Sequence, residues 1–208
     1  HVGRLAFPIF AFLAVEGYFH TRSFKRYALR MLLFAVLSEV PFDLMYGGTV
    51  FYPVHQNVIW TLLLGLLGIR LMEAARAKGK RWLYVLTCAA VVVLGFALGT
   101  LGMVDYYGAG VLTVFVFYFF RERKWWCLLG QLAALYWLNV VVLGGQMYPV
   151  TLFGREIELC EQGLALLALV PVWLYRGRQG HHSKAFQYAC YAFYPAHMLV
   201  LALLTMIQ

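Results

Sequence analysis

Long apolar stretches recur from one end of the chain to the other, and this pattern restricts the chain to a membrane fold. Each stretch approaches the roughly 20 residues that an α-helix needs to cross a bilayer, and short polar segments separate the stretches. Hydrophobic residues make up 63% of the 208 positions and charged residues only 12%, which lies outside the range of soluble globular domains. We therefore predict a polytopic integral membrane protein with no soluble domain.

The apolar runs are continuous rather than alternating, which favours an all-α bundle over a β-barrel. We predict about eight transmembrane helices in a single domain that covers residues 1–208. The predicted helices are Leu5–His20, Tyr27–Tyr46, Asn57–Ala77, Trp82–Gly102, Ala109–Phe120, Trp125–Gly144, Cys160–Tyr175 and Phe186–Met206. Prolines and glycines inside them do not change the prediction, because neighbouring helices can satisfy the freed backbone groups.

Basic residues gather in alternate connections, which predicts the orientation of the bundle. All of the 17 lysines and arginines except Arg4 and Arg155 lie in or beside the connections after the first, third, fifth and seventh helices. By the positive-inside rule these connections face the cytoplasm. The net charge of +8 is thus a topological signal, and no nucleic-acid partner is expected, because no basic and aromatic platform for single strands accompanies it.

The first predicted helix enters from the outer face, and the chain does not begin with Met. A cytoplasmic start would require another helix, so we expect one or more transmembrane helices upstream of His1.

The four cysteines occur singly in predicted helices and form no CxxC pair. Isolated cysteines in apolar helices behave as small hydrophobes. No metal is therefore expected.

Ionisable residues inside the predicted helices are candidate functional groups, because a charged side chain in the bilayer costs about 2.5–3.5 kcal/mol on insertion scales. Glu16 and His20 lie one turn apart on one helix face. Glu39 and Asp43 repeat this spacing on either side of Pro41, which bends a helix and frees a carbonyl. For Glu16 and His20 the structural alternative is a mutual hydrogen bond that holds helices together.

His197 is a further candidate, in the segment "FYPAHMLV" near the middle of the last predicted helix. It follows Pro195 by two residues, where unpaired carbonyls favour a polar cavity, and histidine suits proton transfer near neutral pH. The segment "FYPVHQNV" at residues 51–58 resembles it. An ancestral repeat and a coincidental pattern remain open.

Arg22, Lys25, Arg26 and Arg30 form a basic cluster directly after Glu16 and His20. Such a cluster binds phosphates well, and a phosphorylated donor held there would point its reactive end into the bundle. Ordinary positive-inside anchoring is the alternative.

Five motifs resemble the TraX family of bacterial membrane proteins and occur in the family's order. They are "VGRLAFPIFAFLAVEGYFHTRS", "YALRMLLFAVLSEVPFDL", "HQNVIWTLLLGLL", "DYYGAGVL" and "FYPAHMLVLALL". The resemblance implies a multi-pass acetyltransferase of the bacterial cytoplasmic (inner) membrane. The family's founding member is associated with N-acetylation of a conjugative pilin subunit, and the family is distantly similar to acyltransferase-three type enzymes, which use cytoplasmic acyl-CoA.

The resemblance also implies the site residues. The family's motifs point to Glu16, His20, Glu39, Asp43, His55, Gln56, Asn57, Asp105, Tyr106, Tyr194 and His197. One departure matters, because the family begins with a helix that carries an Asp-His pair, and this chain does not contain that helix. The catalytic set is therefore incomplete.

We hypothesise direct transfer from acetyl-CoA to an amine or hydroxyl of a membrane-associated or envelope acceptor, either a pilin-like peptide or a glycan. The general base is a histidine, either the one on the expected upstream helix or His197, with Glu39 or Glu16 as its orienting group. His20 and Asp43 complete the catalytic candidates. The acceptor-binding candidates are His55, Gln56, Asn57, Asp105, Tyr106 and Tyr194, of which Asn57 or Tyr194 would steady the oxyanion. Arg22, Lys25, Arg26 and Arg30 would hold the CoA phosphates, and membrane lipids complete the expected partners.

Two alternatives remain. In a proton-coupled transporter, Glu16, Glu39 and His197 would form a relay between the two faces. A non-catalytic assembly factor would neither bind acetyl-CoA nor conduct protons.

Overall fold

The computed structural model describes residues 3–152, 155–177 and 183–207, and these residues form a helical bundle with one β-hairpin. In chain order the elements are α1 (Gly3–His20), α2 (Phe24–Gly47), α3 (Val58–Ala77), α4 (Arg81–Leu101), α5 (Tyr107–Phe119), α6 (Trp125–Tyr136), the π-helix η1 (Trp137–Leu143), β1 (Met147–Leu152), β2 (Arg155–Cys160), the 3-10 helix η2 (Glu161–Ala168), α7 (Leu169–Leu174) and α8 (Lys184–Ile207). The predicted all-α membrane bundle is confirmed.

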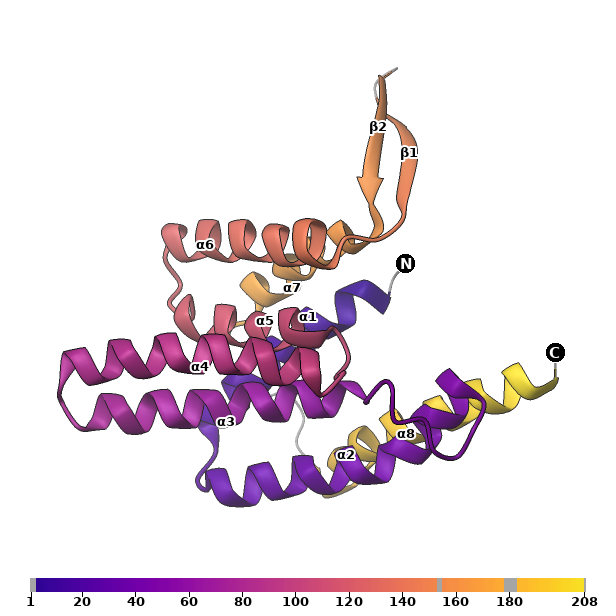
Figure 1. The fold of residues 1–208 in the computed structure, drawn as a ribbon, viewed down its shortest axis with the longest axis horizontal. Helices are drawn as coiled ribbons and strands as arrows, with labels where there is room; N and C mark the ends of the chain where they lie inside the picture. The colour runs from indigo at the N-terminus through magenta and orange to yellow at the C-terminus, as the bar shows by residue number, and fades with distance from the viewer. Residues whose placement is uncertain (1–2, 153–154, 178–182, 208) are drawn as a thin grey trace.

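The long helices run roughly parallel or antiparallel to one another (Figure 1). The turns between α3 and α4 and between α5 and α6 lie at one end of the bundle, on the left of the picture. The connection between α2 and α3, the β-hairpin and both chain ends lie toward the other end. These two turns carry Lys78, Lys80, Arg121, Arg123 and Lys124, and we call the end at which they lie the basic end.

Four helical stretches are long and apolar enough to cross a membrane: Val58–Ala77, Arg81–Leu101, Trp125–Leu143 and Tyr188–Thr205. Only 11% of the second stretch and 6% of the fourth are buried inside the protein. Apolar side chains that face outward over whole helices mark a surface made for lipid. The chain is accordingly a helical membrane protein.

Helices α3 and α5 approach closely because α3 presents glycines to its neighbour. A Cβ atom on Gly68 would lie 2.6 Å from Phe115 Cζ, and one on Gly65 would lie 2.7 Å from Val114 Cβ. Small residues of this kind let membrane helices pack backbone to backbone. The largest fully buried side chains, Phe115, Phe117, Leu66, Ile69 and Met72, belong to the same two helices.

Capping residues mark the start and end of α2 and the start of α3. The Ser23 hydroxyl accepts a hydrogen bond from the Arg26 amide, and Gly48 ends α2 with a left-handed φ of 67°. Asn57 Oδ1 accepts from the Ile59 amide at 3.1 Å and begins α3. Prolines 8, 41 and 195 lie inside α1, α2 and α8 without ending them, as the sequence indicates.

The β-hairpin is the main feature that the sequence analysis does not predict. Strands β1 and β2 pair antiparallel, with Met147 opposite Cys160 and Leu152 opposite Arg155. The predicted helix from Cys160 to Tyr175 also differs, because it starts as the 3-10 helix η2 and becomes α-helical only at Leu169. Likewise, the predicted helix from Trp125 to Gly144 ends as the π-helix η1.

Candidate functional site

A cavity of about 600 Å³ lies between α1, α2, α3 and α8, and we call it the interhelical cavity. Its walls are mostly apolar, and α1, α2, α3 and α8 supply Phe7, Phe34, Leu62 and Met198 respectively. The polar residues that line it include Arg30, Asp105, Tyr106, Tyr194 and His197. An apolar cavity of this size with a few convergent polar groups is the usual form of a small-molecule site.

The position of His197 leaves one ring nitrogen available. Its Nδ1 lies 3.0 Å from the carbonyl oxygen of Phe193, one turn earlier on α8. A carbonyl oxygen only accepts, so Nδ1 carries the proton and Nε2 carries the lone pair. The imidazole stacks on the Phe193 ring at 5.0 Å between centroids and meets the Tyr194 ring edge-on at 5.4 Å. His197 is thus held in the tautomer that a general base requires.

Tyr194 places a second reactive group at the same cavity. Its hydroxyl is buried and lies near the Val58 backbone, but it has no hydrogen bond of good geometry to any described residue. The hydroxyl is close enough to Asp105 and Glu39 for electrostatic interaction. A buried hydroxyl without a hydrogen-bond partner costs free energy. A bound ligand that accepts a hydrogen bond from Tyr194 would remove this cost.

The connection between α4 and α5 brings Asp105 to the cavity, and two other segments fix it there. The amide of Gln56 donates to the Met103 carbonyl at 2.9 Å, and the Asp105 amide donates to the Gln56 carbonyl at 3.0 Å. The Thr61 hydroxyl, on α3, donates to the Asp105 carbonyl at 2.6 Å. These bonds fix the backbone of Asp105, and its carboxylate Oδ1 accepts a hydrogen bond from the Tyr106 amide at 3.1 Å.

Tyr106 adopts a left-handed φ of 61° directly before α5. Its ring stacks on Phe7 of α1, with centroids 4.2 Å apart and planes within 11°. Burial raises the pKa of the Tyr106 phenol, and the neighbouring Asp105 carboxylate adds to the rise. Tyr106 therefore offers the cavity a neutral hydroxyl.

Glu39 and Asn57 lie outside the cavity, in a buried network between α2 and α3. The Asn57 side-chain amide donates to the Ala35 carbonyl at 2.8 Å and to Glu39 Oε2. Trp60 Nε1 donates to the same Glu39 oxygen at 2.8 Å. Since both amide hydrogens of Asn57 are used, it has no donor left for an oxyanion in this geometry. Glu39 Oε1 is buried and has no partner among the described residues.

Asp43 and His55 lie at the end of α2 and in the connection that follows it. Asp43 is 2% exposed, and its Oδ2 accepts from the Tyr52 amide at 2.9 Å. The His55 ring stacks on Tyr46 at 4.7 Å, and its Nε2 lies 3.5 Å from Asp105 Oδ1. Neither residue lines the cavity, but His55 contacts Asp105, which does.

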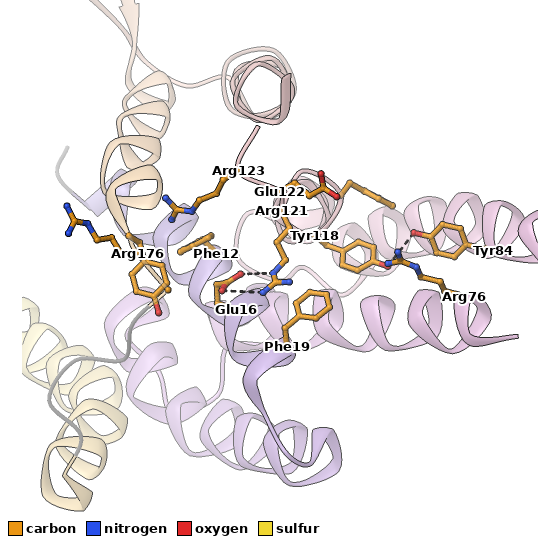
Figure 2. A pocket seen from close by; sticks show the side chains of 13 residues that line it. Phe12, Glu16, Phe19, Arg76, Tyr84, Tyr118, Arg121, Glu122, Arg123 and Arg176 are labelled. Atoms are coloured by element: carbon orange, nitrogen blue, oxygen red, sulfur yellow. Dashed lines mark hydrogen bonds and ion pairs between the residues drawn. The ribbon is translucent and has the colours of Figure 1, made fainter. Parts of the chain in front are cut away.

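Glu16 and His20 face away from the interhelical cavity. Glu16 Oε1 accepts from Arg121 Nε at 2.7 Å, and Glu16 Oε2 accepts from the same guanidinium at 3.5 Å (Figure 2). His20 Nδ1 donates to the Glu16 backbone carbonyl at 2.8 Å, with 62% of its side chain exposed. The main partner of the Glu16 carboxylate is thus Arg121 of the connection between α5 and α6.

Arg121 belongs to a second hollow of about 590 Å³ at the basic end, which we call the basic cleft. Arginines from three parts of the chain line it: Arg76, Arg121, Arg123 and Arg176. These arginines differ from the predicted phosphate-binding cluster, which is Arg22, Lys25, Arg26 and Arg30. These four are exposed, and of them only Arg30 lines the interhelical cavity. The sequence does indicate that the arginines of the cleft lie near the same end of the bundle. It does not show which arginines at that end point into a cleft.

No group of three metal-ligating side chains is present among the described residues.

Known proteins agree with the resemblance carried by the five motifs. A family model described as "TraX protein" matches residues 1–205. A protein named "Probable fimbrial assembly protein FimC, serogroup H1" from Dichelobacter nodosus is 28% identical over 210 residues, which cover 96% of this chain and 80% of that protein. No solved structure matches the chain.

Proposed function

The chain belongs to the TraX family, and on this basis we propose that it is a membrane acetyltransferase. It takes the acetyl group from acetyl-CoA and passes it to an amine or hydroxyl of an acceptor at the membrane. The name of the similar fimbrial assembly protein favours an acceptor from pilus or fimbria assembly, such as a pilin-like peptide. An envelope glycan is the other acceptor class.

One observation carries the proposal. Arg30, Asp105, Tyr106, Tyr194 and His197 come from three distant parts of the sequence and line one cavity. Arg30 is the arginine that lines this cavity and would hold a phosphate of CoA, with Arg22, Lys25 and Arg26 adding positive charge nearby. The apolar walls accommodate the thioester arm, and Asp105 and Tyr106 offer polar contacts to the acceptor.

The chemistry follows from the two groups on α8. The nitrogen or oxygen of the acceptor bonds to the thioester carbonyl carbon, and His197 Nε2 takes the proton that this atom loses. The carbonyl oxygen becomes an oxyanion, and the Tyr194 hydroxyl donates a hydrogen bond to it. The carbon–sulfur bond then breaks, and the CoA sulfur leaves with the proton that His197 holds.

The test is transfer of label from radioactive acetyl-CoA in native membranes. We expect Tyr194→Phe to lower kcat about 100-fold, as loss of one oxyanion donor does, and His197→Gln to lower it about 100-fold or more. Tyr188→Phe is the matched control, since Tyr188 lies on the same helix, 69% exposed. Full activity in Tyr194→Phe, or no transfer by the wild type to any membrane component, would refute the proposal.

The rival transporter needs Glu16, Glu39 and His197 to share a proton path. Glu16 is paired with Arg121 in the basic cleft, Glu39 is bound between α2 and α3, and His197 faces the interhelical cavity. This dispersal favours the transferase. Proton flux through liposomes containing the purified protein would reverse that preference.

We also propose a multi-pass arrangement in the inner membrane with the basic end in the cytoplasm. The test uses single cysteines in a cysteine-free protein. An impermeant maleimide should label Phe51→Cys, at a site 77% exposed, in intact spheroplasts. It should label Lys78→Cys, at the basic end, only after lysis, and the opposite pattern would invert the orientation.

A further inference from the structure

Helix α1 separates the two hollows, because its opposite faces line different ones. Phe12, Glu16 and Phe19, which recur at helical spacing, line the basic cleft. Phe7, Phe10 and Ala14 lie on the other side of the helix and line the interhelical cavity. A ligand in the cleft is therefore distinct from one bound against His197.

The cleft carries positive charge that its own carboxylates do not balance. Glu16 pairs with Arg121 and Glu73 pairs with Arg76, while Glu122 pairs with Lys124 at 2.5 Å. Arg123 donates instead to two backbone carbonyls at the end of α7, the closer at 2.7 Å. Arg176 has no ion pair with a described residue. Two guanidinium groups are thus left for an external anion.

The Glu16–Arg121 pair indicates what kind of anion fits. Arg121 presents Nε and a terminal nitrogen to the two Glu16 oxygens, the fork geometry that also binds phosphate (Figure 2). Glu16 therefore occupies the position of one bidentate oxyanion. A more highly charged phosphate can compete for Arg121 and reach the two unbalanced arginines.

Aromatic rings form the remaining wall of the cleft. Phe19 and Tyr118 are parallel within 2°, with centroids 6.2 Å apart, and the Arg121 guanidinium lies 4.0 Å from the Phe19 centroid. Tyr84 and Tyr175 line the same hollow. Aromatic and guanidinium planes of this kind stack on flat heterocycles, whereas a lipid headgroup has no such ring.

We infer that the basic cleft is a second ligand site, which binds a phosphate-bearing nucleotide. The phosphates contact Arg121, Arg123 and Arg176, and the base packs against the aromatic wall. The inference does not rest on the proposed acetyl transfer, since binding in the cleft needs neither an acetyl donor nor His197.

The test is a titration of the purified full chain with a fluorescent ATP analogue, read by anisotropy in nanodiscs of phosphatidylcholine. We expect saturable binding that unlabelled ATP displaces and that adenosine or pyrophosphate displaces at least tenfold less well. Arg176→Ala should weaken binding about tenfold, and Arg121→Gln should do the same. The matched control is Arg81→Ala, an exposed arginine at the same end that does not line the cleft, with an expected change under twofold.

Other outcomes overturn the inference. Absence of ATP binding refutes the site, and equal loss in Arg81→Ala and Arg176→Ala indicates diffuse surface charge. If phosphatidylglycerol added to the nanodiscs displaces ATP as well as unlabelled ATP does, the cleft binds a lipid headgroup. Arg121→Gln can disturb folding, because it leaves Glu16 without its partner. If Arg121→Gln is misfolded, the test rests on Arg176→Ala, which should keep the wild-type thermal unfolding midpoint. If the protein binds ATP but transfers no acetyl group, the proposed acetyl transfer is refuted and the nucleotide site is supported.

Discussion

Replacement of Asn57 tests whether the buried network joins α2 to α3. Asn57 is fully buried, caps α3 through Oδ1, and uses its amide nitrogen to reach Ala35 and Glu39 on α2. Loss of an N-cap costs about 1 kcal/mol. Side-chain hydrogen bonds between membrane helices average about 0.6 kcal/mol and reach about 1.7. We therefore expect Asn57→Ala to lower the free energy of unfolding by about 2–3 kcal/mol.

A second variant separates the two contributions. Asn57→Ser keeps a good N-cap oxygen but is too short to reach Glu39, so it should cost about 1–1.5 kcal/mol. The control is Gln56→Ala. Among the described residues the Gln56 side chain donates to the exposed Pro53 carbonyl alone, and its loss should cost under 0.5 kcal/mol. The assay is reversible unfolding from mixed micelles by SDS, followed by tryptophan fluorescence.

Two results would refute this reasoning. If Asn57→Ser is as stable as the wild type within 0.5 kcal/mol, the bridge to α2 contributes nothing. If Asn57→Ser and Asn57→Ala are equal, the cap contributes nothing and the fluorescence transition reports another part of the bundle.

Further predictions concern packing, access and ionisation. Gly68→Ala should destabilise the protein by about 1–3 kcal/mol through overpacking. The control is Gly163→Ala, where an added Cβ would lie an ordinary 3.6 Å from its nearest neighbour, and its stability should stay within 0.5 kcal/mol of the wild type. The same SDS unfolding assay compares the two variants. A bulky maleimide should react much faster with Cys190, which is exposed and lines the interhelical cavity, than with the buried Cys127. Acetyl transfer should fall in proportion to the labelling of Cys190, which mass spectrometry measures. Because burial raises the pKa of Tyr106 above its ordinary 10.0, its contribution to stability should be fully present below pH 10 and lost as the pH rises through the raised value. Tyr106→Phe should remove that part of the alkaline loss, and an unchanged alkaline limb would contradict it.

The helices of this fold could be predicted because local hydrophobicity decides them. Val58–Ala77 and Arg81–Leu101 match their predicted ranges within one residue at each end. The predicted start of α2, Tyr27, lies three residues after the observed start, Phe24, because the Ser23 cap is a weak local signal beside a basic cluster. The β-hairpin was missed because two short strands depend on pairing with each other, which hydropathy does not report.

The candidate site was only partly predictable, for a related reason. A histidine inside an apolar helix stands out by its cost in the bilayer, which is why the sequence indicates His197, whereas Tyr194 is indicated only by the resemblance to the TraX motifs. Arginines at a membrane interface all look alike in sequence, so the selection of Arg22 to Arg30 could not reveal that Arg121 and Arg176 turn into the basic cleft. Similarly, nothing in the local sequence around Asn57 indicates that acceptors on α2 satisfy its side-chain donors.

The unequal packing of the walls of the interhelical cavity has a mechanical consequence. On one side α3 is fixed to α5 by glycine contacts that leave no room for adjustment. On the other side α8 packs mainly against α2 and buries little of its surface. A small displacement of α8 therefore loses little apolar contact, whereas the same displacement of α3 would disrupt the core. The cavity thus has one stiff wall and one compliant wall, and the compliant wall is the one that carries Tyr194 and His197.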